Sequence, residues 1–266
     1  MTAGGPDTLI LDNLVAGYGG GDVLRGVSFG VPGASITAVI GPNGAGKSTV
    51  LATIVGLLRP RSGRILLDGK EITGISPLQA ISAGIVIVPQ ARSLFPNMTV
   101  DENVNLGGYT VRDHRVFAER RAMIDEMFPI VTRYAKQRAG RLSGGQQRVV
   151  EFARCLMLEP GVVLLDEPSI GLDPAAMRVV YDSILRMRES GKTVVLVEQN
   201  AKAALEVADK AVLLEAGRVR LAGPAQGLRD HAEIGSVYLG SGAAKIAAPK
   251  RESPVSAPAE RIGQEQ

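Results

Sequence analysis

The clearest chemical signal in the sequence is a glycine-rich run, Gly41-Pro-Asn-Gly-Ala-Gly-Lys47-Ser48, which fits the spacing G-x-x-x-x-G-K-[ST]. It follows the apolar run Ile36–Ile40 and opens a helical stretch, which is the context that a phosphate-binding loop requires. Glycines let backbone N–H groups turn toward an anion, and the helix N-terminus adds the positive end of its dipole. Lys47 can reach the β- and γ-phosphates of a nucleotide, and the Ser48 hydroxyl can ligate Mg²⁺. The residues expected to contact the nucleotide here are Gly41, Pro42, Asn43, Gly44, Ala45, Gly46, Lys47, Ser48 and Thr49.

A second candidate is the apolar run Val162–Leu165, which ends in the acidic pair Asp166 and Glu167. A buried strand of this kind delivers both carboxylates to the carboxyl edge of a sheet, where α/β proteins place their ligands. Asp166 suits the coordination of Mg²⁺, and Glu167 suits orienting or deprotonating the water that attacks a γ-phosphate. An isolated acidic pair after a strand is more often a cap or a turn, but the phosphate loop favours the catalytic interpretation.

The third candidate is Leu142-Ser-Gly-Gly-Gln146, which precedes a helix expected to continue to Leu158. Two interpretations are open. Ser143 could be a simple N-cap followed by flexible glycines, or the free N–H groups, the hydroxyl and the helix dipole could form a second anion site. Two phosphate sites with one nucleotide loop indicate that the second site serves a neighbouring subunit. Its residues are Ser143, Gly144, Gly145 and Gln146.

Short β-branched runs alternate with longer amphipathic stretches, which predicts an α/β fold whose parallel strands are buried on both faces. The expected strands are Leu9–Leu11, Val27–Phe29, Ile36–Ile40, Arg64–Leu67, Ile85–Val88, Val162–Leu165, Thr193–Val197, Ala211–Leu214 and Val219–Ala222. The expected helices cover 47–57, 101–107, 113–127, 145–158, 175–189 and 200–208.

Between Ala91 and Leu142 no convincing strand is found, which indicates a helical subdomain inserted into the core. We expect this subdomain over about 91–159, with the α/β core over about 9–90 and 160–240, so that one domain spans 9–240. Residues 241–266 are rich in Pro, Ser, Glu and Gln and contain no aromatic residue, which predicts a disordered tail. The uncharged stretch 72–91 has bilayer length, but its polar residues and two prolines indicate a turn and a short buried strand instead.

The composition of the 266 residues narrows the function classes. Lys and Arg exceed Asp and Glu by only 30 − 27 = 3 charges, without a dense basic run, so we expect no nucleic-acid partner. The single cysteine, Cys155, excludes an intramolecular disulfide framework and a multi-cysteine zinc site. The N-terminal residues show no basic stretch followed by an apolar run, so we expect no secretory signal and a cytoplasmic location.

Leu-Ser-Gly-Gly-Gln, with the phosphate loop before it and Val-Leu-Leu-Asp-Glu-Pro after it, resembles the nucleotide-binding subunit of ABC transporters over about residues 9–222. The resemblance implies a P-loop NTPase core with a mainly parallel sheet, an N-terminal antiparallel β portion and an inserted helical subdomain. It implies hydrolysis of ATP with Mg²⁺, which Ser48, Gln90 and Asp166 would hold. It also implies that Tyr18 stacks on adenine, that Gln90 touches the attacking water, and that Asp173 communicates across a dimer.

In such dimers two chains lie head to tail, and each ATP is held between one phosphate loop and the partner's Ser143–Gln146. The resemblance therefore implies a homodimer, or a heterodimer with a second ABC ATPase. It further implies transmembrane permease subunits, an indirect partnership with an extracytoplasmic substrate-binding protein, and a position on the inner face of the cell membrane.

One position departs from the family, since Gln199 stands where a switch histidine is usual. Its amide can donate a hydrogen bond to a γ-phosphate oxygen, or it could merely cap the helix that starts near Asn200. The segments Val197–Ala201, Leu94–Asn103 and Tyr238–Gly240 resemble the paired ATPases of branched-chain amino-acid importers, in which glutamine is common at this position. Asp173 is less typical of that group.

Several alternatives stay open at this point. Close cousins import urea or short amides, and the chain could be a non-hydrolysing nucleotide sensor, although Lys47, Asp166 and Glu167 favour an enzyme. The single cassette and the short insert disfavour a relative that acts on DNA or ribosomes.

The other conspicuous residues have simpler interpretations. We expect Cys155, and the pair Met123 and Met127, to pack in the core, the alternative for the pair being a groove for a partner's helix. Four arginines are expected to form a solvated face, the alternative being contact with a partner or with lipid head groups: Arg112, Arg115, Arg120 and Arg121.

Overall fold

The computed structural model describes residues 7–230, and its N-terminal part forms a four-stranded antiparallel sheet in the order β2-β1-β4-β5. The strands are β1 (Asp7–Ala16), β2 (Leu24–Pro32), β4 (Ser62–Leu67) and β5 (Lys70–Glu71). β1 pairs with β2 on one side and with β4 on the other. Its leucines Leu9, Leu11 and Leu14 are fully buried. This is the N-terminal antiparallel portion that the family resemblance implied.

The second sheet has six strands in the order β10-β9-β3-β8-β7-β6. Its strands are β3 (Ile36–Ile40), β6 (Ile85–Val88), β7 (Val162–Asp166), β8 (Thr193–Glu198), β9 (Lys210–Glu215) and β10 (Arg218–Pro224). Neighbours from β9 to β6 pair in parallel, and β10 adds one antiparallel edge strand. The predicted fold class, α/β with a mainly parallel sheet, is confirmed.

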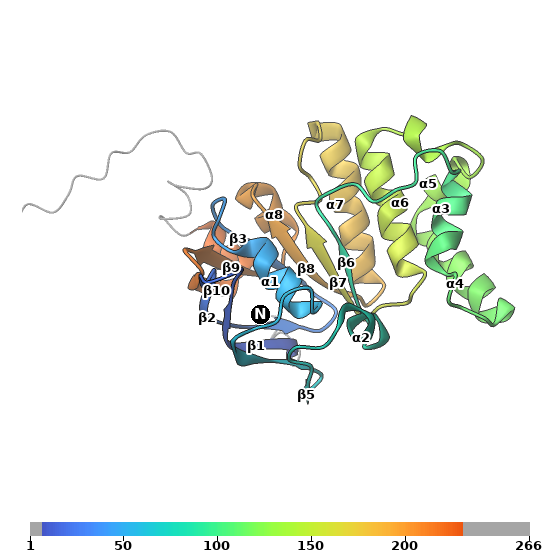
Figure 1. Ribbon diagram of the computed structural model, residues 1–266. Helices are drawn as coiled ribbons and strands as arrows, with labels where there is room; N and C mark the ends of the chain where they lie inside the picture. The colour runs from blue at the N-terminus through green and yellow to red at the C-terminus, as the bar shows by residue number, and fades with distance from the viewer. Residues whose placement is uncertain (1–6, 231–266) are drawn as a thin grey trace, which may run out of the picture.

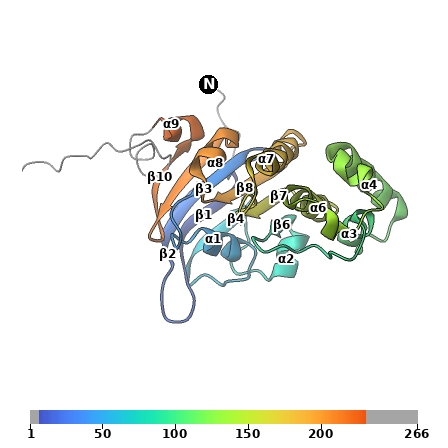
Figure 2. The same cartoon turned by 90° about the horizontal axis from the view of Figure 1, so that it is seen from above.

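The parallel strands are buried on both faces because alternate residues enter two different cores. Ile36, Ala38 and Ile40 pack with α6 (Gly144–Leu156), α7 (Pro174–Glu189) and α8 (Ala201–Val207). Val39 packs on the opposite side, with α1 (Lys47–Ile54) and the antiparallel sheet. Figure 2 shows this arrangement, with α7 and α8 on one face of the parallel strands and α1 on the other.

Between β6 and β7 the chain forms helices and a single isolated bridge, from Thr99 to Arg138. The helices are α3 (Val100–Gly107), α4 (His114–Met127), α5 (Pro129–Arg133), the short 3-10 turn η1 (Ala139–Arg141) and α6. Figure 1 shows α3, α4, α5 and α6 gathered at one end of the molecule, away from the antiparallel sheet. The boundaries of the helical subdomain, about 91–159, stay a prediction, and the tail 241–266 lies outside the described residues.

Three short helices, α2 (Pro77–Ser82), α5 and α9 (Ala225–Arg229), were not among those predicted. α2 begins with a capping box, in which Ser76 and Gln79 exchange side-chain and backbone hydrogen bonds, and with proline in its first turn. α9 follows β10 directly. Within residues 7–230, none of the helices has the length and apolar character needed to cross a bilayer.

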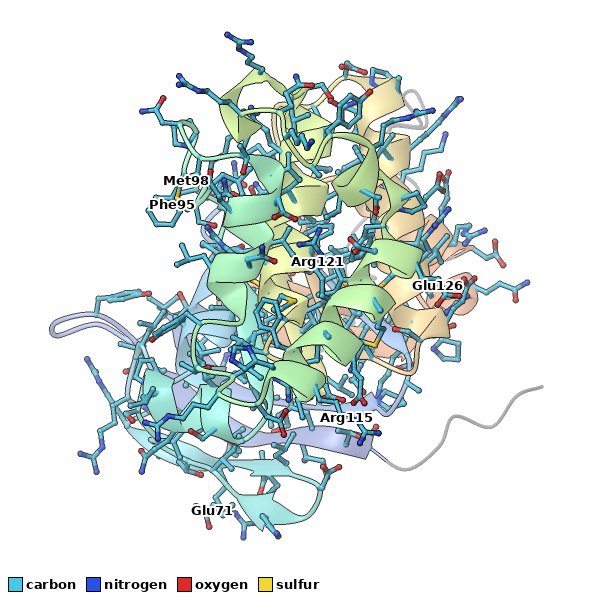
Figure 3. The ribbon with its side chains drawn as sticks, turned by 90° about the vertical axis from the view of Figure 1, so that its right-hand side faces the viewer. Glu71, Phe95, Met98, Arg115, Arg121 and Glu126 are labelled. Carbon is cyan, nitrogen blue, oxygen red and sulfur yellow. The ribbon has the colours of Figure 1, made fainter. Side chains whose placement is uncertain are left out.

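The expected solvated face of four arginines is wrong for two of them. Arg121 donates hydrogen bonds to Asp101 and Asn105 of α3, and it also pairs with Asp125. Arg120 pairs with Glu159 and donates to the carbonyl of Met157. In Figure 3 Arg121 lies between α3 and α4, so these side chains join α4 to its neighbours instead of facing solvent.

Candidate nucleotide-binding and hydrolysis site

The order of the parallel strands brings four chain segments to one edge of the sheet. β3, β8, β7 and β6 are neighbours, and the segments that follow them carry the phosphate loop, Gln199, the pair Asp166 and Glu167, and Gln90. Since the carboxyl ends of parallel strands meet at one edge, these groups converge there. A cleft of about 460 Å³ lies at this edge. It is lined by Val23, Asn43, Gly44, Gly46, Lys47, Ser48, Thr49, Gln90, Glu167, Ile170 and Gln199.

Glycine is required in the phosphate loop for two different reasons. Gly44 and Gly46 have φ values of 79° and 102°, in the left-handed region, where the backbone of a residue with a side chain would be strained. At Gly41, a Cβ atom would collide with the carbonyl oxygen of Leu214 in β9. Gly46 occupies the N-cap position of α1, and the first turn of that helix contains no acidic residue. No acidic residue of the helix itself therefore offsets the positive end of the α1 dipole, which faces the cleft.

Lys47 is almost fully buried, with 5% of its surface exposed, and its ammonium group bends back over the loop. Its Nζ atom donates to the carbonyl oxygens of Gly41 at 3.0 Å and Pro42 at 3.2 Å. The same atom lies 3.6 Å from Oε1 of Glu167. A cation held in this way sits where the phosphates of a nucleotide would enter the cleft.

Ser48 and Asp166 place a hydroxyl beside a carboxylate. Ser48 Oγ donates to Asp166 Oδ1 at 2.9 Å, across the gap between α1 and the end of β7. Burial raises the pKa of Asp166, and the hydrogen bond from Ser48 opposes that shift. Hard oxygen donors of this kind suit Mg²⁺, which commonly takes one or two carboxylates and completes its shell with phosphates and water. Within residues 7–230, no cluster of three His, Cys, Asp or Glu side chains could hold a metal ion alone.

Glu167 is held toward the cleft by its backbone and by its neighbours. Its φ value of 44° ends β7 in the left-handed region, and its N–H donates to the carbonyl of Val197 in β8 at 2.9 Å. Its Oε2 atom accepts a hydrogen bond from Gln90 Nε2 at 3.2 Å. A carboxylate fixed in this way could accept a proton from a water molecule in the cleft.

Gln199 lines the cleft with an exposed side chain. The alternative, that it caps the following helix, is wrong, because Asn200 occupies the N-cap position of α8 and its Oδ1 accepts from the N–H of Ala203 at 3.2 Å. The Gln199 amide is therefore available to a ligand in the cleft.

Several predicted residues are not among the described residues that line this cleft, namely Tyr18, Gly41, Pro42, Ala45, Ser143–Gln146, Asp166 and Asp173. Asp166 instead contacts Ser48, which does line it. Tyr18 is 60% exposed, on a turn that Arg61 fastens through Asp22 and the carbonyl of Gly19. Ser143 forms a capping box with Gln146 at the start of α6, so the N-cap interpretation is confirmed and the anion site stays a prediction. Asp173 caps α7 by accepting from the N–H groups of Ala175 and Ala176.

Comparison with known proteins identifies the family. Residues 24–170, more than half of the chain, match the sequence model of the family described as ABC transporter. The chain belongs to the ABC transporter family. It is an ATPase subunit of that family, and its cassette binds nucleotide.

Three relatives are similar to this chain along almost their whole length. The chain is 40% identical to a probable branched-chain amino acid transport ATP-binding protein, LivF, from Archaeoglobus fulgidus, covering 85% of this chain and 96% of the relative. It is 38% identical to the branched-chain amino acid transport ATP-binding protein BraG of Pseudomonas aeruginosa, covering 87% of this chain and 99% of the relative. It is 32% identical to the lipopolysaccharide export protein LptB of Haemophilus influenzae, covering 87% and 97%.

Solved structures agree with the cassette fold. The ADP conformation of the ATP-binding cassette MJ1267 superposes with a TM-score of 0.80 at 27% identity, covering 88% of this chain and 99% of that one. A dimeric post-hydrolysis state of the cassette MJ0796, bound to ADP and Pi, gives a TM-score of 0.69 at 27% identity, covering 82% and 98%.

The sequence alone missed two residues that line the ABC cassette's cleft. Val23 precedes β2 and follows the glycine-rich turn after Tyr18. Ile170 lies in the loop that ends at Asp173, and it is 46% exposed. Ile170 could have been found from its place in the Ser169–Asp173 loop, whereas Val23 carries no chemical signal that would single it out.

Proposed function

We propose that this cassette hydrolyses ATP with Mg²⁺ at the described cleft and thereby powers an importer of branched-chain amino acids. The observation that carries the catalytic part is the position of Glu167, within hydrogen-bond distance of Gln90 and 3.6 Å from Lys47. A general base, a polar residue that orients it and a phosphate-binding cation are thus present at one cleft.

The residues divide the work by their chemistry. Lys47 and the amides of the phosphate loop bind the β- and γ-phosphates, and Tyr18 contacts the adenine. Glu167 accepts the proton of the attacking water, which Gln90 helps to orient. Gln199 donates a hydrogen bond to the γ-phosphate, where an amide can stabilise the charge that develops in the transition state.

The oxygen donors at the end of β7 fit Mg²⁺, since a hydroxyl and a carboxylate lie together at 2.9 Å. We assign the ion to Ser48, Asp166 and the side chain of Gln90. When bound, Mg²⁺ would neutralise charge on the β- and γ-phosphates.

The active unit is proposed to be a dimer, either of two copies of this chain or with a second ABC ATPase. In support, Ser143–Gln146 begin α6 with glycines and an N-terminal dipole but do not line their own chain's cleft within the described residues. Asp173 lies in the loop that we assign to communication between the two chains. Permease subunits would hold the dimer at the inner face of the membrane, and an extracytoplasmic binding protein would deliver the substrate to them.

The proposal for the substrate class rests on the relatives. Two proteins named for branched-chain amino acid transport match at 40% and 38% identity over 96% and 99% of their length, whereas an iron import protein at 38% identity is covered over only 60% of its length. Gln199 and the Val197–Ala201 segment, which resemble the same group, point in the same direction. Urea or short amides stay the second candidate class.

The test is reconstitution of this cassette with permease subunits and a substrate-binding protein that co-purify with it. Proteoliposomes are charged with ATP, and turnover is measured with leucine, isoleucine, valine, urea and acetamide as separate substrates. We expect binding protein loaded with a branched-chain amino acid to stimulate turnover. Stimulation by urea or acetamide alone would refute the proposed substrate class. An assembly that is active with the parent cassette and inactive with the Glu167→Gln cassette would support the proposed catalytic site.

A further inference from the structure

The helix α6 directs its buried charged side chains at one short segment, residues 89–93. Arg148 is 5% exposed, and its guanidinium donates to two successive backbone carbonyls, those of Pro89 and Gln90, at 2.9 Å each. These carbonyls belong to the segment that leaves β6 and carries Gln90 into the cleft. The planar, forked guanidinium suits two acceptors at fixed spacing, which an ammonium group cannot bind in the same way.

Glu151, one turn further along α6, holds the other end of the same segment. Its side chain is 1% exposed; Oε2 accepts from Arg148 at 2.7 Å, and Oε1 accepts from the backbone N–H of Ser93 at 2.5 Å. A buried ion pair of this kind usually adds little net stability, because removing both charges from water offsets their attraction. The pair fixes the position of residues 90–93 relative to α6, and this is the property that we take to be functional.

The contacts continue to the acid of the cleft. Arg148 holds the backbone of Gln90, and the side chain of Gln90 donates to Glu167 at 3.2 Å. Two side chains therefore join α6, which begins with the Ser143–Gln146 segment, to Glu167 at the end of β7. Displacement of α6 would move Gln90 and change its contact with Glu167.

Resting on the proposed function above, we propose that Arg148, paired with Glu151, is a positioning residue for hydrolysis. It fixes the backbone of Gln90 to α6, so that the arrangement of the Ser143–Gln146 segment determines whether the Gln90 amide stays on Glu167. Arg148 does not touch the nucleotide or the water; it acts through Gln90.

Arg154 supplies a matched control on the same helix. It donates to the carbonyl and hydroxyl oxygens of Ser93 at 2.8 and 2.6 Å, and it lies over the Phe95 ring at 5.7 Å from the centroid. Figure 3 shows Phe95 at the outer edge of the molecule. Arg154 thus fastens the far end of the segment without contacting Gln90.

The experiment replaces the ion pair by an apolar pair, Arg148→Met with Glu151→Leu, because removing one charge alone would leave the other buried and unpaired. We expect a folded chain with a melting temperature within a few degrees of the parent. We also expect kcat to fall by about 10- to 100-fold, since a misplacement of about 1 Å can cost that much, with KM for ATP within about threefold. Arg154→Ala should keep kcat within about threefold of the parent.

A double-mutant cycle shows whether Arg148 acts through Gln90. In a Gln90→Ala background, the Met/Leu pair should lower kcat by less than about twofold further, because the residue through which it acts is gone. If the losses of kcat caused by Gln90→Ala and by the Met/Leu pair multiply in full, the inference is overturned. It is also overturned if the Met/Leu variant keeps the parental kcat.

Hydrogen exchange over residues 89–95 gives a readout that does not depend on turnover. Exchange should quicken in the Met/Leu pair, since the Ser93 N–H loses its acceptor, and unchanged exchange would also overturn the inference. Failure of the proposed function itself would look different, because the parent chain would then show no turnover.

Discussion

Asp166 and Glu167 are neighbours in the sequence, yet both carboxylates reach α1 and meet different partners there. Asp166 Oδ1 accepts from Ser48 at 2.9 Å, whereas Glu167 Oε1 lies 3.6 Å from Lys47 Nζ. Successive residues of a strand point to opposite faces. The left-handed φ of 44° at Glu167 ends the strand and turns the second acid to the same edge as the first. Each acid can therefore have its own role, one toward a metal ion and one toward water.

Replacing Glu167 by glutamine should separate binding from hydrolysis. The amide has the same size and can keep the contact with Gln90, but it cannot accept a proton. We expect ATP affinity close to the parental value and a rate about 10²–10⁴-fold lower, the usual effect of losing a general base. The variant should form a dimer at saturating ATP, detectable by light scattering. A monomer under those conditions would contradict the head-to-tail arrangement, and Glu215→Gln on the surface of β9 is the control.

Replacing Lys47 by alanine should weaken the binding of nucleotide. A hydrogen bond to a charged group contributes about 1.5–3 kcal/mol, so ATP affinity should fall by at least about tenfold. Titration of the chain with ATP by calorimetry measures this directly. Lys70→Ala, an exposed lysine in β5, should bind like the parent. Equal ATP affinity of the Lys47→Ala and Lys70→Ala variants would contradict the assignment of the phosphate loop to the nucleotide site.

Substitutions of the neighbours Gln199 and Asn200 should affect different properties, the rate of ATP turnover for the first and the stability of the fold for the second. Gln199→Ala should slow turnover by about 10- to 150-fold, if the lost hydrogen bond of about 1.5–3 kcal/mol is made only in the transition state. Its melting temperature should be unchanged, because Asn200 makes the cap of α8. Asn200→Ala should show the opposite pattern, a loss of about 1 kcal/mol in the free energy of unfolding and a near-parental rate. A Gln199→Ala chain that is fully active but melts earlier would refute the γ-phosphate contact.

Cys155 should react slowly while the chain is folded. Burial raises the pKa of its thiol to about 11. Because the thiolate is the reactive form, only about one molecule in a thousand carries it at pH 8. Alkylation by iodoacetamide should therefore be far slower in the native chain than in urea, and it should speed up as the pH approaches 11. The chain has no other cysteine, so the mass shift reports on this site alone. Equal rates in the native chain and in urea would contradict the burial.

The fold was easiest to predict where a strand is buried on both faces. The bounds of β3 and β6 match the predicted Ile36–Ile40 and Ile85–Val88, because a strand buried on both faces is a continuous apolar run. β1 was predicted as Leu9–Leu11 only. It continues to Ala16 through Asn13, whose φ of 50° accompanies a shift in pairing with β2. α2 escaped prediction because a six-residue helix with only Ala80 buried has no apolar periodicity.

The site was predictable where chemistry is confined to short motifs. The phosphate loop, Asp166 and Glu167 carry their signal in adjacent residues, and strand order then brings them together. The long-range partners of Arg120 and Arg121 could not be predicted, since Glu159 and Asp101 lie far along the chain, whereas the pair of Arg121 with Asp125 has the i,i+4 spacing of one helix face. The contacts of Arg148 could not be predicted for the same reason, because its acceptors are backbone carbonyls 58 and 59 residues away in the sequence.

The position of β3 in the sheet also determines the order in which a growing chain can fold. β3 pairs only with β8 and β9 among the described strands, and 192 − 40 = 152 residues lie between its last residue and the first of β8. At a synthesis rate of about 5–20 residues per second, β3 would wait roughly 8–30 s for a neighbouring strand. β1, β2 and β4 can pair long before that. During translation, the nascent chain would therefore expose an apolar strand with two unpaired edges, which is the kind of segment that chaperones shield from aggregation.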